Sequence, residues 1–103
     1  MTTIWKYRLA IANEQSLEMP EGAGIVHVGV DPQGCLCIWV ILDEDHQLGS
    51  RQFWITGTGH ALLPVCDIAT YIGSAVAASC VWHVFDGGYE HEQGRRHAVG
   101  VAQ

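Results

Sequence analysis

The residues best suited to chemistry stand in one short turn, Gly57-Thr58-Gly59-His60. Glycines let a ligand approach the backbone closely. Exposed turn amides bind anions, and the hydroxyl and imidazole of this turn supply directed hydrogen bonds. A tryptophan on the preceding apolar run offers a face on which a base stacks, at roughly 1–3 kcal/mol. The sequence therefore predicts a site for a small ligand such as a nucleotide, formed by Gly57, Thr58, Gly59, His60, Trp54 and Arg51.

A plain turn is the alternative for this segment, with its two glycines supplying positive φ. Neither a P-loop lysine nor a βαβ context accompanies it. Catalysis has one candidate group, an imidazole of His60 or His83 acting as acid and base on a nucleotide or another small substrate. Ser74 follows a glycine but lies within an apolar run, outside any G-x-S-x-G elbow, and no cysteine has a catalytic signature. We therefore expect binding without turnover, and keep the histidine enzyme as the alternative.

A second candidate surface is the acidic loop formed by Asp43, Glu44 and Asp45. The chain has 5 basic and 11 acidic residues and a net charge of −6, which disfavours binding to duplex DNA or RNA. The loop lacks the spacing of an EF-hand, so a solvated tip is its plain interpretation. Its functional interpretation is a contact for a basic surface on a host protein that itself binds nucleic acid. This contact and the ligand site at the glycine turn are both kept as versions of the binding function.

No metal or cofactor is expected. The histidines show no zinc-binding spacing, and Cys35 and Cys37 stand too close for a zinc knuckle. Together with Cys66 and Cys80 they are expected to be reduced thiols with a structural role.

Glycine and proline interrupt the chain at short intervals, and the segments between them are rich in β-branched and aromatic residues. This pattern predicts an all-β fold, a small antiparallel barrel or sandwich of about five to seven strands. Pro64 limits any helix in 57–67 to a single turn. Hairpins are expected around Asp31-Pro32-Gln33-Gly34 and around 77–79. The expected strands are 4–11, 16–19, 25–30, 35–42, 51–56, 71–76 and 80–85.

The segment 35–42 is apolar on both faces, so it is predicted to be a central strand with something covering each side. Together with the similar run 80–85 it predicts a homodimer or higher oligomer, because so short a chain does not easily cover two large faces. In 25–30, alternation predicts that Val26, Val28 and Val30 point into the core.

The length allows one domain, predicted to be 1–86, followed by a polar and mobile tail at 87–103. The beginning of the chain lacks the apolar stretch of a signal peptide, and no run approaches the ~18 apolar residues of a membrane span. A cytoplasmic protein without a membrane partner is therefore expected.

Several motifs carry a family resemblance: IWKY, EQSLEMPEGAGIVHVGV, GCLCIWVILDED, FWITGTGH, YIGS and VWHVF. In this order they resemble a family of small phage and prophage proteins of unknown function, over Ile4 to about Asp86. Residues 68–70 and 75–79 depart from the more polar turn expected before VWHVF. The resemblance implies a compact β-fold and a phage or prophage origin, and it brings no catalytic residues.

Small phage proteins of this kind often bind host factors. The resemblance therefore implies a binding protein that counters host defence, by occluding a host protein such as a CRISPR effector or by sequestering a nucleotide signal. A virion structural or assembly protein is the further alternative.

Overall fold

The computed structural model of the chain describes residues 1–90. The predicted all-β class is confirmed, with seven strands and one short 3-10 helix, η1, at Pro64–Ile68. The helix is short, as Pro64 led us to expect, and the proline stands at its start, where its missing N–H is tolerated. The strands are β1 (Thr2–Arg8), β2 (Glu14–Pro20), β3 (Gly24–Val30), β4 (Leu36–Asp43), β5 (Leu48–Gly57), β6 (Thr70–Ala77) and β7 (Cys80–Tyr89).

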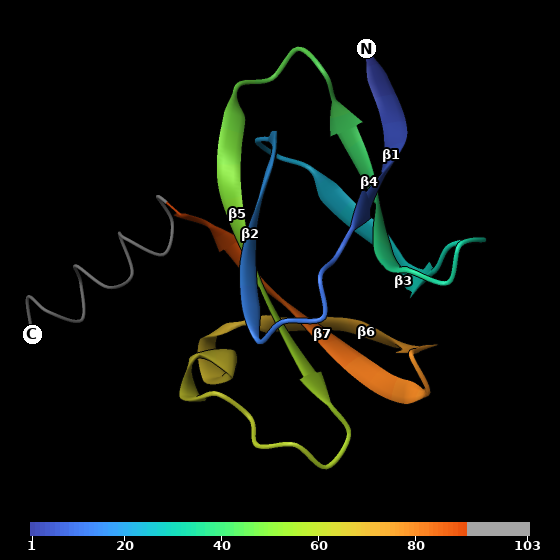
Figure 1. Ribbon diagram of the computed structural model, residues 1–103. Helices are drawn as coiled ribbons and strands as arrows, with labels where there is room; N and C mark the ends of the chain where they lie inside the picture. Colours follow the sequence, from blue (N-terminus) through green and yellow to red (C-terminus); the bar gives the residue numbers. More distant parts are fainter. Residues whose placement is uncertain (91–103) are drawn as a thin grey trace, which may run out of the picture.

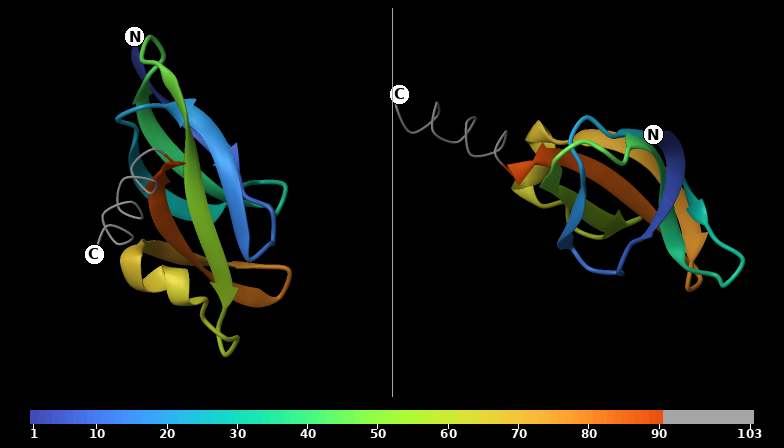
Figure 2. Two further views of the ribbon diagram at one scale, coloured as in Figure 1. Left: turned by 90° about the vertical axis from the view of Figure 1, so that its left-hand side faces the viewer. Right: turned by 90° about the horizontal axis from the view of Figure 1, so that it is seen from above.

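The strands form two antiparallel sheets that pack as a sandwich (Figure 1). One sheet has the order β1-β4-β3 and the other the order β2-β5-β7-β6. Of the two architectures left open by the sequence, the sandwich is the one observed, because the sheets are not closed into a barrel. β3 packs against β6 on one side of the molecule. β1 and β2 are the edge strands of the other side (Figure 2).

The core between the sheets is built from side chains that alternate along each strand. β4 lies in the centre of its sheet, as predicted, and its inward row is almost completely buried. Burying such a side chain contributes about 1.5–3 kcal/mol, so these rows hold the sheets together. The largest fully buried side chains are Phe53, Met19, Leu36, Ile38, Val40, Val84 and Cys37.

The outer face of β4 is only partly covered within residues 1–90. Cys37 is buried and Trp39 half-buried, but Ile41 is 42% exposed. Ile4 lies directly opposite Ile41 on β1 and is 58% exposed. This leaves an apolar strip on the outside of the three-stranded sheet.

The predicted turn between β3 and β4 is present. The Gly34 amide donates to the Asp31 carbonyl at 2.9 Å, with Gly34 at φ 82°. The Asp31 carboxylate accepts hydrogen bonds from the amides of Cys35 and Gln33 and from the Lys6 ammonium group on β1. The Cys35 amide, and after it Lys6, lowers the pKa of Asp31 to about 2. One buried carboxylate thus ties the hairpin to β1.

The prediction that three valines of β3 all face the core is wrong. A bulge between Ile25 and His27 interrupts the period of two. Val28 is buried, but Val26 is 53% exposed and Val30 is 38% exposed. Ile25 packs against the core in their place.

The second predicted hairpin is also present, but its last strand is longer than expected. β7 continues past Phe85 to Tyr89, which pairs with Arg51 of β5 and is buried. The glycine pair after Asp86 suggested the end of the domain. Instead, Gly87 forms a bulge opposite β5, and pairing resumes beyond it. The rest of the predicted tail, 91–103, lies outside the described residues.

Candidate functional site

In the turn after β5, two backbone amides donate hydrogen bonds within the chain. The Thr58 amide donates to the Val81 carbonyl, and the His60 amide donates to the Gly57 carbonyl, both at 3.0 Å. The His60 ring lies over Gly57, where an added Cβ would meet Nδ1 at 2.7 Å. These bonds remove two of the amides that the sequence assigned to an anion.

His83 on β7, rather than His60, is where polar side chains converge. Its Nε2 atom lies 2.7 Å from the Thr58 hydroxyl, and its Nδ1 atom lies 2.9 Å from the Tyr71 hydroxyl on β6. A neutral imidazole accepts at one nitrogen and donates at the other, so one hydroxyl donates to the ring and the other accepts. This arrangement can hold or move a proton. The contact between Tyr71 and His83 could not be predicted from the sequence. It depends on the register between β6 and β7, which a bulge between Tyr71 and Gly73 shifts.

Trp54 does not offer the stacking face that the sequence suggested. Its side chain is buried, with 5% exposure, and its indole N–H donates to Glu14 at 3.2 Å. The indole packs on the backbone of Gly87, where an added Cβ would stand 1.9 Å from Cζ3. No room remains for a base against this ring face.

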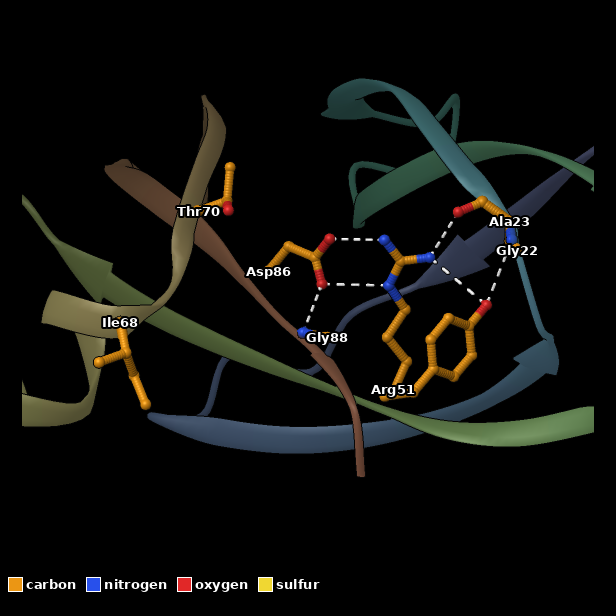
Figure 3. A pocket seen from close by; sticks show the side chains of 8 residues that line it. Gly22, Ala23, Arg51, Ile68, Thr70, Asp86 and Gly88 are labelled. Carbon is orange, nitrogen blue, oxygen red and sulfur yellow. Dashed lines mark hydrogen bonds and ion pairs between the residues drawn. The ribbon is translucent and has the colours of Figure 1, made fainter. Parts of the chain in front are cut away.

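Arg51 belongs to a different part of the molecule from the glycine turn. It precedes Gly57 by six residues on β5, which at the rise of a strand is about 20 Å. Its guanidinium group is buried and binds Asp86 through two nitrogens, with Nε–Oδ1 at 3.0 Å (Figure 3). Nη1 donates to the Ala23 carbonyl at 2.6 Å, and the group lies over the Tyr89 ring at 5.0 Å.

The Arg51 side chain lines a polar cavity of about 330 Å³. Burial opposes the charged guanidinium, but the hydrogen bond and charge of Asp86 outweigh it and raise the pKa of Arg51 above its usual value. The cation is therefore permanent and already neutralised by a carboxylate. The pocket has no net positive charge to offer a phosphate. The residues that line it are Gly22, Ala23, Arg51, Ile68, Thr70, Asp86, Gly88 and Tyr89.

The acidic loop lies at the end of β4, next to the N-terminus. The Met1 ammonium group binds Asp43 at 3.2 Å and Asp45 at 2.9 Å. The Asp45 amide, and after it the Met1 ammonium, lowers the pKa of Asp43. Glu44 is exposed, and its carboxylate makes no hydrogen bond or ion pair within residues 1–90. Of the three loop carboxylates, Glu44 is the one available to a partner.

A groove of about 360 Å³ opens between β1 and β2, beside this loop. Trp5 and Tyr7 of β1 form one wall, with ring centroids 6.4 Å apart. This groove was not predicted from the sequence, because its residues come from segments far apart in the chain. The lining residues are Trp5, Tyr7, Glu18, Pro20, Leu42, Glu44 and Leu48.

The described part of the chain holds no group of three histidine, cysteine or acidic side chains placed to bind a metal ion. All four cysteines are free thiols, and burial raises the pKa values of Cys37 and Cys66. Between residues 1 and 90, no helix has the length and apolar character needed to cross a membrane.

Comparison with known proteins gives one family. Neither the curated proteins nor the solved structures contain a match to the chain. Residues 1–95 match a family model described as Domain of unknown function (DUF7352). The match spans all seven strands, both hairpins and the groove between β1 and β2. The chain therefore belongs to this family of unknown function.

Proposed function

We propose that the protein is a phage or prophage binding protein that counters a host defence system by occluding a basic surface on a host protein, such as a CRISPR effector. It binds without catalysing a reaction and acts in the cytoplasm of the infected or lysogenic bacterium. The observation that carries the proposal is the acidic end of the sandwich. There the exposed side chain of Glu44 makes no hydrogen bond or ion pair within residues 1–90, and it borders an open groove with one aromatic wall.

The charge distribution supports a basic partner. Residues 1–90 contain three basic side chains, and two of them are paired, Lys6 with Asp31 and Arg51 with Asp86. The unpaired carboxylates therefore determine the potential of the described surface. Complementary charge speeds encounter and selects the partner, and host proteins that bind nucleic acid present basic surfaces.

Sequestration of a nucleotide has less support than occlusion of a protein. Two amides of the glycine turn donate to carbonyls within the chain, and Trp54 is buried. Arg51 lies far from the turn along β5, and Asp86 neutralises its charge. These were the groups expected to bind the base and the phosphate.

A histidine-dependent enzyme remains the second candidate, because one observation favours it. The Thr58 hydroxyl lies 2.7 Å from His83 Nε2, and the Tyr71 hydroxyl orients the opposite nitrogen. A hydroxyl beside an oriented imidazole is the arrangement of an activated nucleophile. In this version His83→Gln and Thr58→Val would abolish the biological effect.

A plaque assay tests the proposal. The chain is expressed in bacterial strains that each carry one defence system, and each strain is challenged with a phage that the system restricts. We expect the wild-type chain to restore plaques in one strain. The variant with Asp43→Ala, Glu44→Ala and Asp45→Ala should lose this effect, whereas His60→Ala and His83→Gln should keep it.

Full protection by the loop variant would contradict occlusion through the acidic end, and loss only in His83→Gln would favour the enzyme. Asp43 also binds the N-terminus, so the loop variant could lose its effect because the fold is less stable. The melting temperature of each variant is therefore compared with that of the wild-type chain. The single change Glu44→Lys reverses the charge of a side chain that makes no internal bond within residues 1–90, so it tests the surface without this complication.

A further inference from the structure

We infer that the groove between β1 and β2 binds the lysine or arginine side chain of an extended basic segment in the partner protein. The inference rests on the proposed function, and it names the chemistry that the groove recognises. It follows from three features of the groove: its position at two open sheet edges, its exposed aromatic wall and the single sign of its charge.

The position of the groove follows from the sheet topology. Among the strands of residues 1–90, β1 pairs only with β4 and β2 pairs only with β5, so each is an edge strand. The two edges line the same groove, to which β1 contributes Trp5 and Tyr7 and β2 contributes Glu18 and Pro20. Edge strands carry unpaired backbone groups, which an extended segment can use. An extended chain therefore fits the groove better than a compact ligand does.

The aromatic wall is exposed where a core residue would be covered. Trp5 and Tyr7 lie opposite Val40 and Ile38, so both side chains stand on the inner face of the sheet. Trp5 is nevertheless 47% exposed, because β1 is the last strand of its sheet in the described part of the chain. Neither the Trp5 indole N–H nor the Tyr7 hydroxyl has a hydrogen-bond partner within residues 1–90. An exposed indole face attracts a cation.

The charged groups of the groove are both carboxylates. Glu18 and Glu44 are exposed, and neither makes an ion pair or a hydrogen bond through its side chain in the described residues. Lys6 lies between Trp5 and Tyr7 in the chain, on the other face of β1, and is bound to Asp31. The remaining lining, including Leu42 and Leu48, is mostly apolar.

A lysine or arginine side chain matches both parts of this lining. Its aliphatic stem packs on apolar surface while its charged end reaches carboxylates and the aromatic wall. A bare divalent cation does not match, because it prefers an oxygen shell and the groove offers only two carboxylates.

Titration with hexa-arginine tests the inference, beside hexa-citrulline, which has nearly the same shape without the charge. The full chain is used, and calorimetry at 20 mM and 150 mM salt gives the affinity. We expect hexa-citrulline to bind at least ten-fold more weakly than hexa-arginine. Trp5→Leu should weaken hexa-arginine binding about five-fold, and Glu18→Gln with Glu44→Gln about ten-fold.

Asp67→Asn is the matched control. It removes one exposed carboxylate on η1, outside the groove, and should change the affinity less than two-fold. An equal loss in this variant would mean that overall charge alone attracts the peptide, and the inference would fail. It would fail also if hexa-arginine did not bind.

A measurement on the wild-type chain tests the role of Trp5 without any substitution, so it holds even if the Trp5→Leu variant does not fold. In a nitrogen–proton NMR spectrum, the indole signal of Trp5 should shift on addition of hexa-arginine, while those of Trp39, Trp54 and Trp82 stay in place. Movement of the other signals without that of Trp5 would place the peptide elsewhere.

The two proposals can fail separately. If hexa-arginine binds in the groove but the loop variant still protects phage, the groove is a cation site, and occlusion of the host protein through the acidic end is wrong. If the loop variant loses protection and hexa-arginine does not shift Trp5, the acidic end acts without the groove.

Discussion

Gly87 has no room for a side chain, because the Trp54 indole lies directly on its backbone. An added Cβ would stand 1.9 Å from Cζ3 and 2.4 Å from Cη2 of Trp54. Gly87→Ala must therefore displace a buried indole or distort the β7 bulge, and we expect it to cost about 3 kcal/mol of unfolding free energy. Urea unfolding measures this loss.

Gly24→Ala is the control for Gly87→Ala. Gly24 has no atom within 4 Å of the added Cβ, so its unfolding free energy should change by about 0.5 kcal/mol or less. Equal stability of the two variants would show that Trp54 does not hold the position described here.

Asp31 makes the stability of the fold depend on acid. Its pKa is lowered to about 2 by the Cys35 amide and Lys6, against about 3.9 in an unfolded chain. A lowered pKa stabilises the folded state above the unfolded value, and this contribution disappears as the pH falls from about 4 to about 2. Asp31→Asn removes this titration but still accepts the turn amides.

The expected result is a smaller loss of melting temperature between pH 5 and pH 2 in Asp31→Asn than in the wild-type chain. Thermal unfolding followed by circular dichroism measures both. Asp67→Asn, which removes an exposed carboxylate outside this network, should keep the wild-type difference. Identical curves for Asp31→Asn and wild type would show that Asp31 is not held as described.

At the scale of single elements, the β6–β7 turn is formed despite its sequence. Ala78 and Ser79 join Ala77 to Cys80 with φ values of 51° and 63°. Each non-glycine residue in this region costs about 1–2 kcal/mol, and Asn-Gly is the pair that a two-residue turn of this type prefers. The strands must therefore hold the turn in place.

Replacing the turn with Ala78→Asn and Ser79→Gly should stabilise the protein by about 1–2 kcal/mol. The urea midpoint should rise while the slope of the transition stays the same. Gly34→Ala should lower the urea midpoint, because Gly34 has φ 82°, which strains any other residue. An added Cβ at Gly34 meets no atom within 4 Å, so a clash does not contribute. A lower midpoint for the turn variant would contradict the described backbone.

The strands could be predicted because period and turn chemistry are local signals. The β3–β4 hairpin follows from the Asp-Pro-Gln-Gly turn, and the central place of β4 follows from its two apolar faces. The β3 valines and the end of β7 could not be predicted, because bulges at Val26 and Gly87 depend on the partner strand.

The candidate site was predictable only in part, for a related reason. Residue types suitable for binding are visible in a sequence, and the exposure of Glu44 follows from its polar loop. Burial of Trp54 and neutralisation of Arg51 depend on Gly87 and Asp86, more than 30 residues away. The groove lining comes from both edge strands, so only the packing of the two sheets reveals it.

For the whole molecule, the exposed strip on the β1-β4-β3 sheet keeps the prediction of a homodimer open to test. Ile4, Ile41 and Val26 are all more than 40% exposed around the half-buried Trp39. We expect a second copy to cover the strip, with twice the chain mass in light scattering at tens of micromolar, a concentration above usual dimer dissociation constants.

Ile41→Lys should convert the dimer to a monomer, because it places a charge in the middle of the strip. Val76→Lys is the control, since Val76 is 62% exposed on β6 and lies outside the strip. A monomeric wild-type chain, or a dimer that survives Ile41→Lys, would contradict this interface.

The order in which the chain enters the two sheets has a consequence for folding kinetics. β1 and β2 are made first but belong to different sheets, and their partners come much later: Thr2 pairs with Asp43, and Glu14 pairs with Trp54. Loops of this length must close before any of these contacts form, so we expect folding in milliseconds to seconds. At a synthesis rate of roughly 5–20 residues per second, β4 is synthesised a few seconds after β1, and until then β1 has no partner strand. The strands that carry the groove are thus the ones that a chaperone would meet unpaired.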